Sequence, residues 1–202
     1  MHIRIILFST LMLFCAVTAM AQRPGPEFWR RVTCEPFEPR TKLEAIDERH
    51  STVVIKAFTR ITTVEVSGVR IDAVEMREMG NVSRAKGIVL VVASEPRPGG
   101  EGNNRPRDNR AFIDYEEIEP LLNAIDATSR IDETMTKFPG FEAKYRTLGD
   151  LEITVFRQTR SGNAAILTTG ACEQARTSLT LDELAKIRAM IQEAKTRLDE
   201  IR

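Results

Sequence analysis

Few residues of this chain could carry covalent chemistry, and the cysteines are the first to consider. There are three, and Cys15 lies in a stretch that we predict to be removed, which leaves Cys34 and Cys172. In an oxidising compartment these two allow one intramolecular disulfide, which would tie an N-terminal arm to a late loop. Two free thiols are the alternative. Catalytic cysteine chemistry is less expected, because no CxxC or CxC pair occurs.

One histidine and one acidic run are the other candidates for catalysis or metal binding. His50 is the only histidine after residue 21, and a single histidine without cysteines or carboxylates at ligand spacing forms neither a zinc site nor a triad. Glu116, Glu117 and Glu119 stand at the start of a predicted helix, where the helix dipole favours acidic residues. Metal binding or paired-carboxylate catalysis is the alternative. We predict no catalytic residue, no metal and no cofactor, with His50 on the surface.

A basic segment is the last candidate site. Residues 95–110 are rich in proline, glycine and asparagine and contain no apolar anchor, which predicts a mobile loop. Three acidic residues dilute its basic character, so a solvated loop is one interpretation and an anion-binding loop the other. The residues that would bind the anion are Arg97, Arg105, Arg107 and Arg110.

The N-terminus has the pattern of an export signal. Basic residues stand at the front, an apolar run covers 5–16, and Ala19 and Ala21 provide small residues before a cleavage that we place between Ala21 and Gln22. A retained anchor needs about 20 apolar residues, and this run is shorter. Lipidation at Cys15 is a further alternative. We expect an exported protein, periplasmic or secreted, without a membrane span after cleavage.

The charge balance bears on the class of ligand. Removal of residues 1–21 deletes Arg4, so 29 − 1 = 28 Lys and Arg remain against 29 Asp and Glu. Binding to nucleic acid draws much of its free energy from the release of counterions by a basic surface. A chain of nearly zero net charge lacks that excess, which argues against a nucleic acid held mainly through its phosphates.

The first half predicts an arm, a short helix, four strands and a helix. Prolines in 22–40 indicate an extended arm, and a capping box at Thr41 and Glu44 begins a helix over 42–49. Strands are expected at 52–58, extending toward 66, and at 69–78, 87–93 and 111–113. Alternation in 69–73 predicts one wet face, whereas the apolar run 88–93 predicts a central strand. Asp114 and Glu117 mark the next helix start, with a late start or a bend near Pro120.

The second half repeats this order. Strands are expected at 141–147, 151–158, 164–169 and 177–179, followed by a capping box at Thr180 and Glu183. The long helix that follows has an apolar stripe, which would cover a sheet or, alternatively, support self-association. The stripe consists of Leu184, Ile187, Ile191, Ala194, Leu198 and Ile201.

An internal duplication organises the chain. Cap and stripe positions recur 66 residues apart, so that Asp114, Ile118 and Leu121 correspond to Thr180, Leu184 and Ile187. We predict an α+β protein of two consecutive ββββα repeats whose antiparallel sheets pack together with their helices. The boundaries are a signal at 1–21, an arm and short helix at 22–50, and repeats at 51–133 and 134–202.

Two consecutive units of four strands and a helix resemble Whirly proteins, paired purine-rich-element-binding repeats and dimeric transcriptional positive cofactors. The resemblance is one of topology over about residues 51–202 and transfers no binding residues. It implies two sheets packed face to face with helices closing the core, and it raises single-stranded nucleic acid as a ligand. The aromatic residues Phe141, Tyr145 and Phe156, which could stack on bases if exposed, are predicted to lie in the core.

These observations predict an exported, non-catalytic binding or structural module with a protein partner or an envelope component as its ligand. The first alternative is a binder of single-stranded nucleic acid or another anionic polymer, using a sheet face and the arginine-bearing loop. The second is a hydrolase whose site the sequence does not display.

Overall fold

The computed structural model divides the chain into two compact units, Met1–Glu35 and Pro36–Arg202. It describes residues 38–64, 66, 68–81, 83–93, 108–131, 135–136, 138–158, 162–170 and 174–201, all in the second unit. The predicted disulfide (Cys34, Cys172), the cleavage site (Ala21, Gln22) and three of the predicted loop arginines (Arg97, Arg105, Arg107) lie outside these residues.

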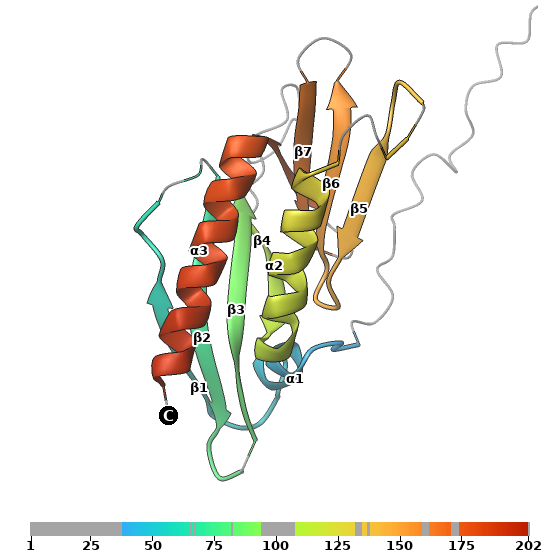
Figure 1. Cartoon of the computed structure of the whole chain (residues 1–202). Helices are drawn as coiled ribbons and strands as arrows, with labels where there is room; N and C mark the ends of the chain where they lie inside the picture. The colour runs from blue at the N-terminus through green and yellow to red at the C-terminus, as the bar shows by residue number, and fades with distance from the viewer. Residues whose placement is uncertain are drawn as a thin grey trace, which may run out of the picture. The chain divides into compact units, whose positions relative to one another are not determined.

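The second unit contains two four-stranded antiparallel sheets, each followed by a helix (Figure 1). This confirms the predicted α+β class with two strand–helix units. The first half comprises α1 (Lys42–Asp47), β1 (Val54–Arg60), β2 (Val69–Glu78), β3 (Arg84–Ala93), β4 (Asp108–Asp114) and α2 (Tyr115–Ser129). The second half comprises β5 (Glu142–Arg146), β6 (Leu151–Gln158), β7 (Gly162–Thr169), β8 (Ala175–Thr180) and α3 (Leu181–Glu200). In both sheets the strand order follows the chain.

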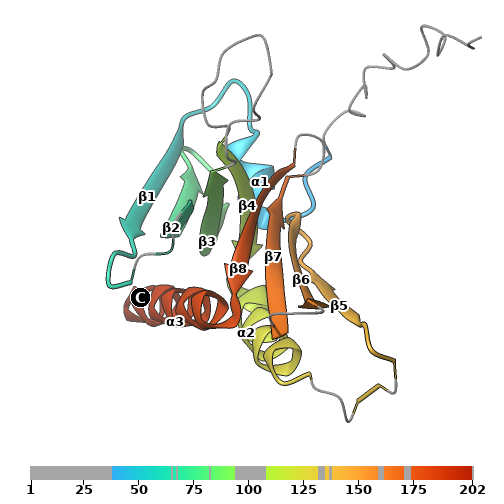
Figure 2. The same cartoon turned by 90° about the horizontal axis from the view of Figure 1, so that it is seen from above.

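The two halves share one hydrophobic core. Helices α2 and α3 pack against each other, and each contacts strands of both sheets: α2 contacts β3, β4, β5 and β6, while α3 contacts β2, β3, β7 and β8. Figure 2 shows the two helices side by side beneath the sheets. The main cluster of buried residues accordingly includes Leu90, Ile118 and Leu122 from the first half and Ile153 and Ile187 from the second.

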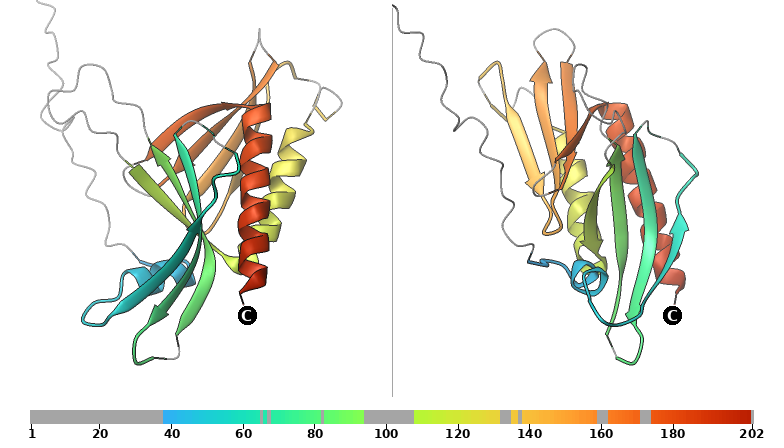
Figure 3. Two further views of the ribbon diagram at one scale, coloured as in Figure 1. Left: turned by 90° about the vertical axis from the view of Figure 1, so that its left-hand side faces the viewer. Right: turned by 180° about the vertical axis from the view of Figure 1, so that it is seen from behind.

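The first sheet is covered on both faces, as the apolar run in β3 predicted. Ile88, Leu90 and Val92 face the shared core, whereas Val89 and Val91 pack in a second cluster beneath α1. Figure 3 shows α1 and α3 on opposite sides of this sheet. The arrangement explains why β3 lacks the polar alternation of a strand with one solvated face.

The predicted wet face of β2 is wrong, because α1 covers the face that carries Asp72. Residues 71–76 are all buried, and Asp72 is only 8% exposed. Its carboxylate forms ion pairs with Arg60 at 3.2 Å and Arg70 at 3.4 Å, which compensate the cost of removing a charge from water.

Asp114 is the N-cap residue of α2, as predicted, but its side chain does not cap this helix. The Asp114 carboxylate makes no hydrogen bond to α2. Instead it accepts from the backbone N–H groups of Lys42 (2.8 Å) and Leu43 (3.1 Å) at the start of α1. The predicted capping box of Thr41 and Glu44 is confirmed there. Together these groups satisfy the first N–H donors of α1 and join it to the end of β4.

Several predicted boundaries need correction. Helix α2 begins at Tyr115 and contains Pro120, so the late start is wrong. Strand β1 ends at Arg60. Of the predicted extension toward residue 66, the described residues show a hydrogen bond from the Ile61 N–H to the Ile71 carbonyl and an isolated bridge between Val66 and Val69. The predicted loop 95–110 ends earlier, since β4 begins at Asp108 and pairs with β3 through Arg110.

The apolar stripe of helix α3 packs in the core of the chain. The capping box at Thr180 and Glu183 is confirmed, and Leu184, Ile187 and Leu198 have no exposed surface. Of the predicted stripe, only Ile201 is exposed. The prediction that the stripe covers a sheet is therefore confirmed, and the alternative of self-association through it is not, because the chain's own sheets and α2 already cover it. No helix among the described residues is both long enough and apolar enough to cross a bilayer.

Candidate functional site

Among the described residues, no helix lies over one face of the second sheet, and we call this surface, formed by β5–β8, the open face. Along β6, Leu151, Ile153 and Val155 are buried against the shared core, while Glu152 and Thr154 point the other way. β6 pairs with β5 and β7, and β7 pairs with β8, so this alternation continues across the sheet. The polar side chains of the open face are Glu142, Lys144, Arg146, Glu152, Thr154, Thr168, Arg176 and Ser178.

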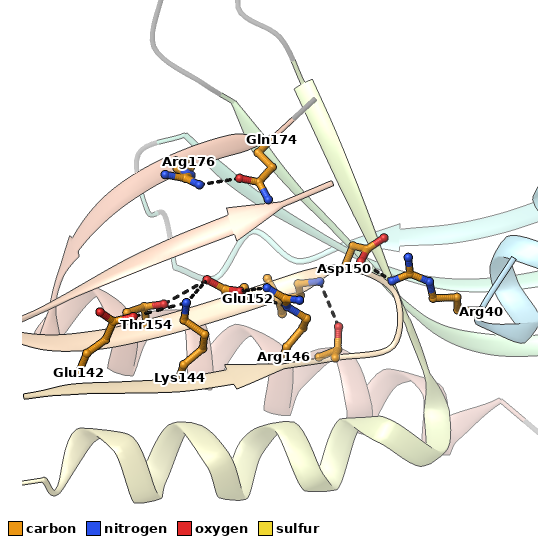
Figure 4. Close-up of polar contacts among 11 residues, drawn as sticks. Arg40, Glu142, Lys144, Arg146, Asp150, Glu152, Thr154, Gln174 and Arg176 are labelled. Carbon is orange, nitrogen blue, oxygen red and sulfur yellow. Dashed lines mark hydrogen bonds and ion pairs between the residues drawn. The ribbon is translucent and has the colours of Figure 1, made fainter. Parts of the chain in front are cut away.

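Glu152 is the centre of a polar network on the open face (Figure 4). One carboxylate oxygen accepts from the Arg146 guanidinium, whose Nε lies 3.1 Å away. The other lies 3.2 Å from the Lys144 ammonium and accepts from the Thr154 hydroxyl at 3.3 Å. Arg146 lies directly opposite Glu152 in the register of β5 and β6, so cross-strand pairing brings these groups together.

The network fixes the charge state of its members. The hydrogen bond from Arg146 holds the pKa of Glu152 below its usual value of 4.5, and Lys144 lowers it further. In turn, the hydrogen bond to Glu152 raises the pKa of Lys144. All three groups are therefore ionised at neutral pH. Glu152 is well placed to accept hydrogen bonds, but a carboxyl group that acts as a general acid at neutral pH needs a raised pKa, not a lowered one.

A hollow of about 160 Å³ lies at one end of the open face. Asp150, at its wall, adopts a left-handed backbone conformation (φ 59°) in the turn before β6. Its carboxylate accepts from the Arg40 guanidinium at 2.7 Å, which brings the segment before α1 to the second sheet. The remaining lining residues are Arg146, Glu152, Thr168, Gly170 and Gln174.

Strand β4 of the first sheet packs closely against the turns that form this hollow. Phe112 of β4 forms a bridge with Gly149, where a Cβ atom would lie 1.9 Å from the Phe112 carbonyl oxygen. Gly170 has φ 92°, and a Cβ there would lie 2.1 Å from the Asn109 side chain. The Thr169 hydroxyl donates to the Asn109 carbonyl at 3.2 Å. Glycine is favoured at both positions, because a side chain at Gly149 would meet the backbone of Phe112 and because Gly170 has a positive φ.

The open face and its hollow carry charges of both signs. The cations are Arg40, Lys144, Arg146 and Arg176, and the anions are Glu142, Asp150 and Glu152, which leaves 4 − 3 = one net positive charge. Arg176 donates to the Gln174 side chain at 2.6 Å. A surface of this kind offers donors and acceptors side by side, and its cations already have partners within the chain.

The residues predicted from the sequence as catalytic candidates do not come together. His50 is exposed between α1 and β1, as predicted. Glu116 pairs with Lys42 at 2.6 Å, Glu119 lies 4.0 Å from Lys195, and Glu117 accepts from the Leu148 N–H at 2.8 Å. These contacts direct the three carboxylates to three different elements. Within the part of the chain that the structure describes, no group of three or more His, Cys, Asp or Glu residues could hold a metal.

Of the predicted anion-binding arginines, Arg110 is the only one that the structure describes. It is exposed and lies within β4, not in a loop. Of the three aromatic residues predicted to lie in the core, Phe141 and Tyr145 are partly buried and pack against the core. Phe156 is half-buried and lies on the same strand face as Glu152 and Thr154, so its placement in the core is wrong.

The residues of the open face were not identified from the sequence, although one signal was present. Glu142, Lys144 and Arg146 alternate with Ala143 and Tyr145, which indicates a strand with one strongly polar face. The pairing of Arg146 with Glu152 depends on the register across the turn at 147–150. The approach of Arg40 depends on tertiary contacts that no local pattern encodes.

Comparison of the chain with protein-family models, with curated proteins and with solved structures finds no match. Of the predicted resemblance, the structure shows the coarse arrangement alone, two four-stranded antiparallel sheets, each followed by a helix.

Proposed function

We propose that this chain is an exported, non-catalytic binding module whose ligand lies on the open face of the second sheet. The observation that carries the proposal is the contrast between the two sheets. The first is covered on both faces, by α1 and by α2 with α3, whereas the described part of the chain covers the second on one face only. The uncovered face presents the ordered network around Glu152 and the hollow next to Asp150.

The chemistry of this face favours a ligand that both donates and accepts hydrogen bonds, as a polypeptide surface of a partner protein does. Arg146, Lys144 and Arg40 are each held by a carboxylate of the chain. A polyanion would have to compete with Glu152 and Asp150 for these cations. A polar partner can instead use the remaining N–H donors and carboxylate lone pairs without breaking the pairs.

Photo-cross-linking inside cells that produce the chain tests the proposal and captures the partner in the same step. A photoreactive amino acid replaces Ser178, an exposed open-face residue on β8. The matched control carries the same group at Lys186, which is exposed on α3. We expect a discrete adduct with a protein from Ser178 and none from Lys186. Equal labelling from both positions, or no adduct from Ser178, contradicts the proposal.

Single-stranded nucleic acid or another anionic polymer is the second candidate, favoured by the four cations on and beside the open face and by the half-buried Phe156. Binding of the purified chain, residues 22–202, to single-stranded DNA and RNA at two salt concentrations separates the candidates. Affinity that falls steeply with salt supports the polyanion, since phosphate contacts release counterions. Absence of salt-sensitive binding leaves the protein partner.

A further inference from the structure

Strand β1 forms an outer edge of the first sheet with an unpaired row of backbone groups. Hydrogen bonds from Ile61 N–H to the Ile71 carbonyl (3.0 Å) and from Met79 N–H to the Val53 carbonyl (2.8 Å) flank the strand. In an antiparallel pair these bonds recur at alternate residues, so 55, 57 and 59 bond to β2. The backbone groups of Val54, Lys56, Phe58 and Arg60 therefore point away from the sheet, and no hydrogen bond to them is found among the described residues.

This edge lacks the protection that exposed edges usually have. Charged side chains that project from an edge strand commonly keep it from pairing with another strand. In β1 both charged side chains turn back over the chain's own sheet. The Lys56 ammonium lies 5.8 Å from the centre of the Phe112 ring, and Arg60 pairs with Asp72.

Apolar side chains are left exposed along the same strand. Phe58 is 59% exposed and Ile55 is 49% exposed, on opposite faces of β1. A groove of about 350 Å³ runs between the strand and the C-terminal end of α3, lined in part by Ala57, Thr59 and Ile201. Large exposed apolar residues beside an unpaired edge are the features of a surface that accepts another strand.

We propose that β1 pairs antiparallel with β1 of a second copy of this chain, about a two-fold axis at Ala57. Three registers place outward-facing residues opposite each other at the centre of such a pair. In one, Lys56 faces the partner's Lys56, and in another it faces the partner's Arg60, so like charges oppose each other. In the third, Lys56 faces the partner's Phe58 and Val54 faces the partner's Arg60. Of these three registers, this one alone avoids opposed like charges.

The same register gives the largest set of new contacts. All four outward residues of each strand form hydrogen-bonded pairs, and the partner's Ile55 lies opposite Thr59, beside the groove at Ile201. The interface is isologous, so it closes after two copies and does not propagate into a fibre. The first sheets of the two copies become one continuous sheet, and the second sheets keep their open faces free.

The oligomeric state of the full mature chain tests this inference. Light scattering coupled to size-exclusion chromatography should show a dimer that dissociates on dilution. Phe58→Lys should give a monomer with an unchanged circular dichroism spectrum, because it places a lysine opposite the partner's Lys56. Phe138→Lys changes another exposed phenylalanine, which lies after α2, and should remain dimeric. A chain that is monomeric at every concentration, or a dimer that Phe58→Lys leaves intact, overturns the inference.

Cysteine cross-linking tests the register. Residue 57 and its partner form a non-hydrogen-bonded pair with Cα atoms about 4.5 Å apart, within the range of about 4.4 to 6.8 Å that a disulfide spans. Ala57→Cys should therefore give a disulfide-linked dimer under mild oxidation. Thr59→Cys is the control, because four residue steps of about 3.3 Å separate the two copies of position 59. Equal cross-linking of the two variants contradicts the register.

Discussion

At the scale of single residues, Asp114 shows how one side chain can join separate elements. The sequence places it at the N-cap of α2, but its carboxylate accepts from Lys42 and Leu43 at the start of α1. The short helix α1 covers one face of the first sheet, and Arg40, just before this helix in the chain, lies at the hollow. Asp114 therefore contributes indirectly to the position of Arg40.

Replacement of Asp114 by alanine should lower the free energy of unfolding by about 1 to 2 kcal/mol, because two N–H donors of α1 lose their acceptor. Urea unfolding measures the change. Asp114→Asn keeps one acceptor oxygen and should cost less. The control is Glu48→Ala, an exposed residue at the end of α1, where we expect a change within about 0.5 kcal/mol. Equal effects of Asp114→Ala and Glu48→Ala would show that the interaction contributes nothing.

Glu117 is a second residue whose environment predicts a measurable effect on the stability of the fold. Burial raises its pKa above 4.5, and one of its carboxylate oxygens is buried without a hydrogen-bond partner. A raised folded-state pKa means that ionisation opposes folding. The penalty is absent below the unfolded-state pKa near 4.5 and complete above the folded-state pKa.

Glu117→Gln removes this penalty and can still accept from the Leu148 N–H. The variant should therefore exceed the wild type in free energy of unfolding by more at pH 8 than at pH 4. Urea unfolding at the two pH values gives the comparison. Glu119→Gln, an exposed carboxylate of the same helix, controls for the loss of one negative charge. If the free energies of unfolding of Glu117→Gln and the wild type change in parallel with pH, the interpretation is refuted.

At the scale of elements, hydrophobic periodicity predicted most of the fold. The bounds of β2 and β6 agree with the sequence, and the capping box of α3 is present. Periodicity states which face of an element is buried but not which element covers it. Asp72 illustrates the limit. Its alternation with apolar neighbours predicted a solvent-exposed face, but α1 covers that face in the structure. The network around Glu152 needed the cross-strand register, which depends on the turn and not on either strand.

Helix α3 allows a matched comparison between two isoleucines of one predicted stripe. Ile187 has no exposed surface, whereas Ile201 is 41% exposed. Ile187→Ala should lower the free energy of unfolding by about 2 to 5 kcal/mol, since it leaves a cavity in the shared core. Ile201→Ala should change it by less than about 0.5 kcal/mol. Chemical unfolding at a low protein concentration gives both values, and similar losses for the two variants would contradict the burial of the stripe within the chain.

At the scale of the whole second unit, the fold assigns different roles to its surfaces. Helices α2 and α3 each cover strands of both sheets, so the repeats build one core between them. The first sheet is covered on both faces and has an open edge at β1, which suits pairing with a second copy. The second sheet has one uncovered face, which suits a ligand. The two surfaces belong to different sheets, so a dimer formed through β1 can bind two ligands.

The central claim is that the open face binds the ligand through the network around Glu152. The most direct test is the yield of the Ser178 photo-adduct when Arg146 is replaced by alanine. Arg146→Ala removes one partner of Glu152 but leaves Lys144 beside it. Arg49→Ala, an exposed arginine after α1, is the control. We predict that Arg146→Ala abolishes the adduct and that Arg49→Ala leaves it unchanged; an adduct of equal yield in both variants would contradict the claim.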